Sequence, residues 1–264
     1  MKARESILVE ARYARTGIIT LGAIFSVGIF LIFLSLPLFF AEVAAGQSRY
    51  TLNGLEPVKY STSPDKLRQA ATEMNSATLW MPQNRKYAEG RISLTLGIYE
   101  HYVTIGEGHS RKARRLLASI DDQIVTALTH SPASSNLWYL LSETRVRLAP
   151  HDHRIFDYLK MSYMTGPREG WIASRRLAFA LKNWNQLDLD NQRFAEQDIR
   201  LLWAEQPYRK YLAAIFLKTT RSGKKLIYRH INDGGYEEVL KFRASLRKLG
   251  WKSKNALLYE VMLN

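Results

Sequence analysis

The sequence predicts an all-α protein in which one N-terminal transmembrane helix precedes a body of successive helices. Three observations lead to this fold class. A run of 26 residues, 16–41, carries no charge. Helix start and stop signals recur through the rest of the chain, and no alternating polar and apolar run is bounded by hairpin turns. As a helix, the uncharged run would rise roughly 39 Å, enough for a hydrocarbon core of about 30 Å.

The uncharged run differs from the core helix of a soluble protein, because it shows no polar face. Lys2, Arg4, Arg12 and Arg15 precede it, whereas only Arg49 follows it closely. The positive-inside rule then places the N-terminus in the cytoplasm and the body across the membrane. We expect a single-pass protein of the bacterial inner membrane with a periplasmic body.

A cleaved signal peptide is the alternative to a retained anchor. Val43-Ala44-Ala45 offers small residues at which a signal peptidase could cut. The apolar run, however, is much longer than the 7–15 residues typical of the hydrophobic region of a signal peptide. We therefore expect the segment to stay as an anchor.

After a polar linker, the rest of the sequence predicts one helix after another. Ser63 is a suitable N-cap, Pro64 suits the first helical position and Asp65 the first turn, and this helix should end before Pro82. The same signals predict further helices at 85–105, from the Ser110 cap to Pro132, at 136–148, 152–164, 167–187, 191–205, 208–219 and 236–249.

Two spacings indicate that helix pairs repeat. Pro132 and Pro167 lie 35 residues apart, and Trp138 and Trp171 lie 33 apart. These values bracket the 34-residue period of tetratricopeptide repeats. The junction that resembles a tetratricopeptide boundary is Ala127-Leu128-x-x-x-Pro132-x-x-x-x-x-Trp138-x-x-Leu141.

Packing explains the residue types at this junction. A small Ala lets adjacent helices approach, Pro ends one unit, and the aromatic residue fills the groove between units. Ser142 stands where the motif usually has Gly, and the helix at 152–164 lacks the small-residue pattern. The resemblance therefore implies a degenerate tetratricopeptide-like domain, with a plain helical bundle as the alternative.

A second stretch extends the resemblance and reads Met161-Ser162-x-x-x-Gly166-Pro167-Arg168-Glu169-x-Trp171. It is followed by Arg175-Arg176, Trp184-x-x-Leu187 and Asp198-Ile199-x-x-x-Trp203. With the N-terminal anchor, these motifs resemble small bacterial membrane proteins encoded with exopolysaccharide or capsule biosynthesis machinery. That resemblance implies a non-enzymatic accessory role in polysaccharide assembly or export. The Gly-Pro-Arg-Glu motif is equally explained as a helix N-terminus with Pro and Glu in favourable positions.

Positive charge is concentrated near the C-terminus. Residues 208–254 carry a net charge of +10, out of +14 for the whole chain. Such a segment attracts lipid headgroups, acidic polysaccharides, nucleic acid or acidic proteins, although a merely solvated surface is the alternative. The candidate binding residues are Arg209, Lys210, Lys218, Arg221, Lys224, Lys225 and Arg229. A periplasmic body argues against nucleic acid as the partner.

The sequence predicts neither an enzyme nor a cofactor or metal site. The chain has no cysteine, which excludes disulfides, thiolate metal sites and cysteine nucleophiles. His151-Asp152-His153 could bind zinc or copper in principle, but adjacent side chains rarely converge on one ion without a distant ligand, so the start of a helix is the favoured explanation. Asp121 and Asp122 should point to different faces of a helix and so make a poor catalytic pair.

Four tryptophans, Trp138, Trp171, Trp184 and Trp203, fall within apolar helical stripes. Core packing is the first explanation of these residues. The alternative is that some of them line a groove and stack on sugar rings.

These observations divide the chain into a cytoplasmic stub and anchor at 1–45, a linker at 46–62, a tetratricopeptide-like domain at 63–206 and a basic helical extension at 207–264. The expected function is a non-enzymatic, membrane-anchored scaffold or accessory subunit for the assembly or export of a cell-surface polysaccharide. Its expected partners are proteins of a membrane complex. The alternatives are a module that binds anionic lipid or an acidic polymer, and a structural subunit of another membrane complex.

Overall fold

The computed structural model describes residues 25–46, 48 and 63–251. The predicted cytoplasmic stub, most of the predicted linker and the last thirteen residues lie outside this range. Regular structure in the described residues is helical throughout, as the sequence predicts. The chain divides into two compact units, Met1–Leu94 and Thr95–Asn264, and the boundary falls within helix α3 (Arg85–Thr104).

The first unit contains the helix Phe25–Gly46, helix α2 (Pro64–Trp80) and the first half of α3. The predicted start of α2 is confirmed. The Ser63 hydroxyl accepts a hydrogen bond from the backbone N–H of Lys66 at 3.4 Å, and Pro64 occupies the first turn. A side-chain cap of this kind satisfies a backbone donor that the helix itself leaves without a partner.

The helix Phe25–Gly46 is long and apolar enough to cross a membrane. Its large apolar side chains, among them Phe30, Phe33 and Val43, are exposed. This exposure argues against a core helix, because a core helix buries its apolar side chains. Ala41 and Ala45, one turn apart near its end, are fully buried.

Three contacts hold the end of this helix against α2 and α3. The Tyr87 hydroxyl donates a hydrogen bond to the Glu42 carboxylate at 2.7 Å, and the Lys86 ammonium lies 3.9 Å from the same carboxylate. The rings of Phe40 and Trp80 stack with centroids 4.9 Å apart. The last turns of the helix are therefore part of the first unit's packing.

The second unit contains the rest of α3 and the following helices. They are α4 (Arg111–His130), α5 (Ser135–Leu148), α6 (Ile155–Thr165), α7 (Gly170–Lys182), α8 (Leu189–Ala204), α9 (Arg209–Lys218), α10 (Arg221–Asn232) and α11 (Tyr236–Lys248), with the short 3-10 helices η1 (Trp184–Gln186) and η2 (Gln206–Tyr208).

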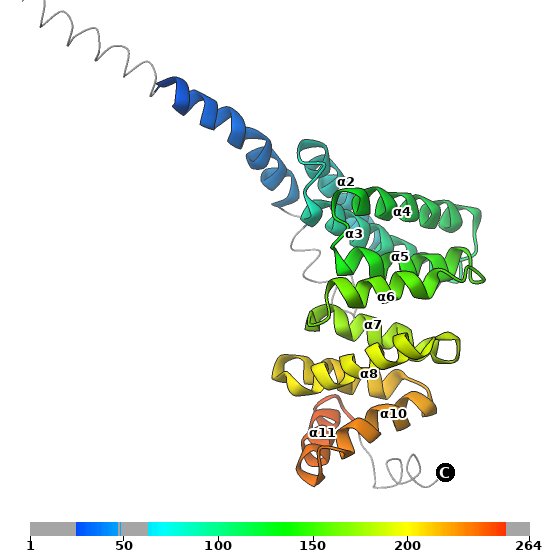
Figure 1. Cartoon of the computed structure of the whole chain (residues 1–264). Helices are drawn as coiled ribbons and strands as arrows, with labels where there is room; N and C mark the ends of the chain where they lie inside the picture. Colours follow the sequence, from blue (N-terminus) through cyan, green and yellow to red (C-terminus); the bar gives the residue numbers. More distant parts are fainter. Residues whose placement is uncertain (1–24, 47, 49–62, 252–264) are drawn as a thin grey trace, which may run out of the picture. The chain divides into compact units, whose positions relative to one another are not determined.

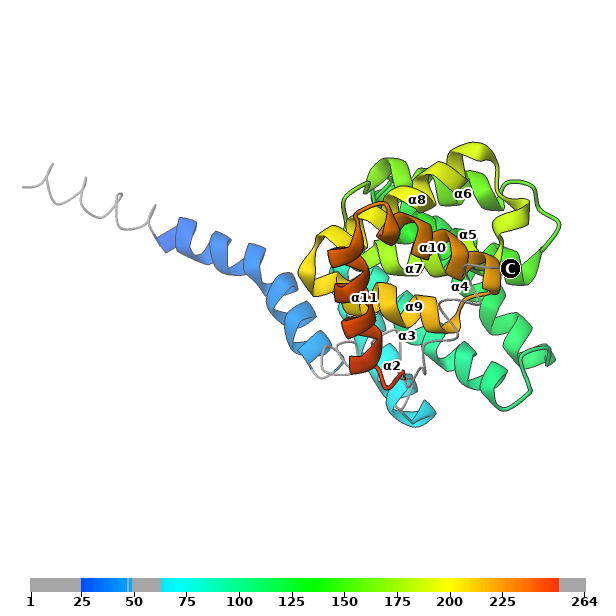
Figure 2. The same ribbon diagram turned by 90° about the horizontal axis from the view of Figure 1, so that it is seen from below.

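Helices of the second unit pack on close neighbours in chain order. Among the described residues, every well-packed pair of α-helices joins elements one or two places apart in the chain. Figure 1 shows the helices from α4 to α8 following one another in this order, and Figure 2 shows α9 beside α10 and α11. Short-range packing of this kind is typical of helical solenoids. Whether successive pairs are tetratricopeptide repeats stays a prediction.

Four prolines end helices at the predicted positions: Pro82, Pro132, Pro150 and Pro167. The residue before each proline has nearly the same conformation, with φ from −149° to −136° and ψ from 63° to 71°: Met81, Ser131, Ala149 and Gly166. A proline disfavours the helical conformation in the residue before it, which explains the common helix end.

One helix was not predicted, and two others begin three residues later than predicted. Helix α6 begins at Ile155 and α7 at Gly170, so His151-Asp152-His153 lies in the turn before α6 and is not the start of the helix.

No helix was expected between 219 and 236, but α10 occupies this stretch, capped by the Thr220 hydroxyl, which accepts from the N–H of Gly223 at 3.2 Å. The sequence did not predict this helix because its first turn contains Ser222 and Gly223 and most of its residues are polar or basic. Only Ile227 and Ile231 form a short buried stripe. Helix α7 ends at Lys182, before the predicted 187, because the Asn183 amide donates to the Phe179 carbonyl at 2.8 Å.

The described part of the predicted basic extension, 207–251, packs on the helices before it. Helices α9 and α10 both pack on α8 within the second unit. Leu212, Phe216 and Phe242 of this region are buried. The basic side chains therefore project from a folded part of the helical body.

Candidate functional site

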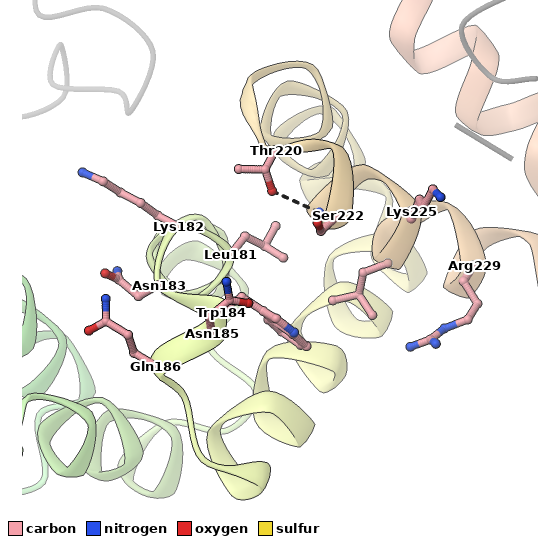
Figure 3. A pocket seen from close by; sticks show the side chains of 12 residues that line it. Leu181, Lys182, Asn183, Trp184, Asn185, Gln186, Thr220, Ser222, Lys225 and Arg229 are labelled. Carbon is pink, nitrogen blue, oxygen red and sulfur yellow. Dashed lines mark hydrogen bonds between the residues drawn. The ribbon is translucent and has the colours of Figure 1, made fainter. Parts of the chain in front are cut away.

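A groove of about 580 Å³ lies between the end of α7 with η1 and the first turns of α10 (Figure 3). Its lining residues are Leu181, Lys182, Asn183, Trp184, Asn185, Gln186, Thr220, Ser222, Gly223, Lys225, Leu226 and Arg229. The described lining includes three cationic side chains and no carboxylate. A groove with this charge favours an anionic ligand.

One side of the groove is formed where α7 ends and continues as η1. The Gln192 amide of α8 donates to the backbone oxygens of Trp184 at 3.4 Å and Leu187 at 3.3 Å, which holds this turn against α8. Trp184 is half-buried, and its indole N–H donates to none of the described residues. Part of the indole and its donor group thus remain accessible from the groove.

The other side is the N-terminal half of α10. Lys225 and Arg229 are four residues apart on this helix and so lie on the same face. Arg229 Nη2 lies 3.3 Å from Glu196 Oε1 of α8, whereas Lys182 and Lys225 form no ion pair with any described residue. Two of the three cations therefore have no neutralising partner in the described part of the chain.

The groove combines three kinds of binding group. Lysine and arginine bind carboxylate, sulfate or phosphate. The amides of Asn183, Asn185 and Gln186 can both donate and accept hydrogen bonds, as sugar hydroxyls require. Trp184 adds an aromatic surface of the kind that stacks on sugar rings, and Figure 3 shows it on the side of the groove that η1 forms.

Of the seven basic residues singled out in the sequence, Lys225 and Arg229 line the groove. Lys218 is exposed at the end of α9, and Arg221 is the first residue of α10. Sequence reasoning missed Lys182, which the groove adds to this group. No local pattern could have found it, because it lies on α7 and meets α10 only in the folded chain.

The other three predicted basic residues pack on aromatic rings. The Arg209 guanidinium lies 4.8 Å from the centre of the Trp203 ring, and its Nε donates to the Trp203 carbonyl at 2.7 Å. Lys210 lies 4.8 Å from the centre of the Tyr211 ring. Lys224 likewise lies over Phe216, at 6.0 Å. None of these three residues belongs to the described lining of the groove.

The predicted repeat junction forms a packed turn. The Trp138 indole N–H donates to the Pro132 carbonyl at 2.7 Å, and its ring stacks on Tyr158 with centroids 6.2 Å apart. Ala127 and Leu141 are buried. Each residue of the junction thus has a structural role in packing.

The Gly-Pro-Arg-Glu motif has a comparable role. A Cβ atom on Gly166 would lie 2.6 Å from the Ser135 Cβ, so the close approach of α6 to α5 requires glycine here. The Ser135 hydroxyl donates a hydrogen bond to the Glu169 carboxylate. Pro167 and Arg168 are exposed in the turn. These contacts favour a structural role for the motif, but the expected helix position of Pro167 is wrong, because α7 begins only at Gly170.

The four tryptophans of the apolar stripes have different environments. Trp203 is buried, as core packing predicts, whereas Trp138 and Trp184 are half-buried. Trp171 is exposed, so the expectation of a core position is wrong for this residue. It lies at the start of α7 on the outer face, one position before the buried Ile172.

The other candidate residues have local partners. Asp121 is buried and accepts hydrogen bonds from Arg145 at 2.5 and 2.6 Å, whereas Asp122 is exposed, so the two point to different faces as predicted. Asp152 accepts from the Arg154 guanidinium at 3.0 Å. In the described ranges no three His, Asp or Glu side chains are grouped so that they could hold a metal ion.

Comparison with known proteins leaves the family resemblance as a prediction. No family model, no curated protein and no solved structure matches this chain.

Proposed function

We propose that this protein is a membrane-anchored, non-enzymatic accessory subunit that binds an acidic cell-surface polysaccharide during its assembly or export. The observation that carries the proposal is the groove between η1 and α10, which Lys182, Lys225 and Arg229 line together with Trp184, with no carboxylate in its described lining. A scaffold of this kind needs only to hold its polymer, which charge and ring stacking can achieve.

The exposed helix Phe25–Gly46 supports the anchoring part of the proposal. An exposed apolar helix of this length is favourable in a bilayer and unfavourable in water. The proposed topology has a cytoplasmic N-terminus and a periplasmic body in the bacterial inner membrane, as the basic flank at 2–15 favours. Partner proteins of a membrane complex would deliver the polymer to the body.

The mixture of groups favours an acidic glycan over a lipid headgroup. A phosphate headgroup on a membrane surface is attracted by clustered positive charge alone. The groove adds the side-chain amides of Asn185 and Gln186, and the Trp184 indole N–H, which has no partner among the described residues. These groups suit a ligand with many hydroxyl groups. An acidic sugar would use both sets of groups.

Direct binding tests the proposal. The full chain in detergent micelles would be titrated with an oligomer of galacturonic acid and, separately, with an uncharged oligomer of galactose. We expect the acidic oligomer alone to bind and its affinity to fall as salt is raised. Lys225→Glu should weaken binding by about tenfold or more, since one lost charge contact is worth about 1.4 kcal/mol or more.

Matched variants identify the groove as the site. Lys218→Glu changes charge equally on an exposed lysine outside the groove lining, and it should alter binding much less than Lys225→Glu. Trp184→Ala should weaken binding without changing its salt dependence. Equal effects of the two lysine variants would contradict the groove. Binding to anionic vesicles but not to the oligomer would favour a lipid ligand instead.

Co-purification tests the assignment to polysaccharide machinery. A C-terminal tag, extraction in mild detergent and mass spectrometry should recover polysaccharide synthesis or export proteins in stoichiometric amounts. Recovery of the protein alone, or with an unrelated membrane complex, would contradict this part of the proposal. A topology reporter at the C-terminus should be active only in the periplasm.

A further inference from the structure

The first unit exposes a second apolar surface beside its apolar helix. Leu79 and Trp80, the last two residues of α2, are 76% and 50% exposed. Single exposed apolar residues are common on proteins. This pair is different because the Trp80 ring stacks on Phe40 of the helix Phe25–Gly46, with an interplanar angle of 23°. The exposed apolar surface is therefore continuous from that helix to the end of α2.

The position of Phe40 sets the depth of Trp80. Phe40 lies two residues before Glu42, the first charged residue after the uncharged run at 16–41. In a membrane-spanning helix, the hydrocarbon region ends near this point. Trp80 must lie at a similar depth, since the two ring centroids are 4.9 Å apart. Tryptophan is enriched at this boundary because its ring is apolar and its N–H is polar.

Basic residues that could reach lipid phosphates follow the apolar pair Leu79 and Trp80 closely in the chain. Arg85 and Lys86 are exposed at the start of α3, directly after the turn that follows Trp80. Lys86 lies 3.9 Å from Glu42, and Arg85 lies 3.6 Å from Glu89, so each also has a carboxylate nearby. Long basic side chains can place their charge among lipid phosphates while their stems lie along apolar surface.

We propose that residues 79–86, the turn from α2 to α3, form a second membrane contact seated at the boundary between headgroups and acyl chains. The inference rests on the anchoring part of the proposed function. It adds that the first unit meets the bilayer at two places, the helix and this turn. The hydrogen bond from Tyr87 to Glu42 links the two, so the orientation of the unit relative to the bilayer is restricted.

Site-specific labelling tests this contact, because the chain has no native cysteine. Leu79→Cys in the full chain would carry an environment-sensitive fluorophore and be reconstituted into phosphatidylcholine–phosphatidylglycerol vesicles. We expect strong quenching by lipids with a nitroxide near the headgroup and weaker quenching by lipids with a deep nitroxide, since interfacial groups lie about 5–10 Å deep. Leu189→Cys, at a leucine 70% exposed in the second unit, is the control and should not be quenched.

A third labelled position separates failure of this inference from failure of the anchor. Phe33→Cys lies within the apolar helix and should be quenched best by the deep nitroxide. Quenching at position 33 without quenching at 79 would overturn the inference and leave the anchor intact. Absence of quenching at both positions would overturn both. Equal quenching at 79 and 189 would indicate general adsorption and would also overturn the inference.

Discussion

Arg176 of α7 and Asp198 of α8 form a doubly hydrogen-bonded ion pair that is fully buried in the second unit. Arg176 Nε lies 3.1 Å from Asp198 Oδ2, and Nη2 lies 2.9 Å from Oδ1. The remaining nitrogen, Nη1, donates to the carbonyls of Ser162 at 3.0 Å and Gly166 at 2.9 Å. One arginine thus joins the end of α6 to α7 and α8.

Replacement of Asp198 should be severely destabilising. Asp198→Asn leaves the Arg176 guanidinium buried without a counter-charge, and arginine cannot lose its proton. We expect the free energy of unfolding to fall by about 3–5 kcal/mol. Chemical unfolding of the full chain in detergent micelles would measure this. Asp190 lies on the same helix as Asp198 and forms an exposed ion pair with Lys160 of α6. Asp190→Asn is therefore the control and should have little effect.

Replacement of Arg176 should have a smaller effect that depends on pH. Burial raises the pKa of Asp198 from 3.8 to about 7, although Arg176 opposes the shift by its charge and hydrogen bonds. In Arg176→Met the carboxyl can take up a proton, so we expect a smaller loss of stability than in Asp198→Asn. The folded state then binds a proton that the unfolded state releases near pH 4.

The sign of this pH dependence follows from the raised pKa. Stability of Arg176→Met should fall as pH rises from about 4 through the folded pKa, since ionisation is unfavourable only in the folded state. Unfolding measured at pH 5.5 and pH 8 would detect the slope. The double variant with Asp198→Asn should lose it. A slope that persists in the double variant would assign the effect to another group.

Gly170→Ala should destabilise the second unit. A Cβ atom at this position would lie 2.1 Å from Cε2 of the Tyr208 ring. Gly170 is the first residue of α7, where the helix preference of alanine has less effect than in a helix interior, so overpacking should dominate and cost about 1–3 kcal/mol. Thermal unfolding would measure the change. In a Tyr208→Ala background the same substitution should be neutral or stabilising, and a persistent loss there would contradict the steric explanation.

His230 should make stability fall in mild acid. Burial lowers its pKa below 6.5, and Arg200 and Arg229 lower it further, while Glu196 opposes the shift. The unfolded state therefore takes up a proton first, and the stability present above pH 6.5 is lost as pH falls. The free energy of unfolding, measured in urea, should fall less between pH 7.5 and pH 5.5 for His230→Gln than for the unchanged chain. The exposed His130→Gln should leave the drop unchanged.

Local signals predicted most helix boundaries because they act through neighbouring residues. The Ser63, Ser110 and Thr220 hydroxyls each accept from a backbone N–H three residues later. Of these, only the Thr220 cap was missed, because the basic first turn of α10 obscured its apolar stripe. Proline stops likewise depend on the residue just before them. Such features need no knowledge of distant parts of the chain.

The groove could be predicted only in part. Lys225 and Arg229 were among the basic candidates because charge density is visible in the sequence. Their partners Lys182 and Trp184 belong to another helix end, and no periodicity relates them to α10. The pairing of Arg176 with Asp198 could not be predicted either, because the two residues lie on different helices. Both occupy buried positions of their helices.

The sequence by itself determined the all-helical class, an apolar helix long enough to span a membrane, and the proline helix ends, since each depends on local chemistry. Tertiary structure decided which charges are buried, as at Arg176, and which remain available, as at Lys225. It also placed α10 beside η1 to form the groove. The physical reason is that burial and ion pairing depend on distances between residues far apart in the chain, which only the packing of helices sets.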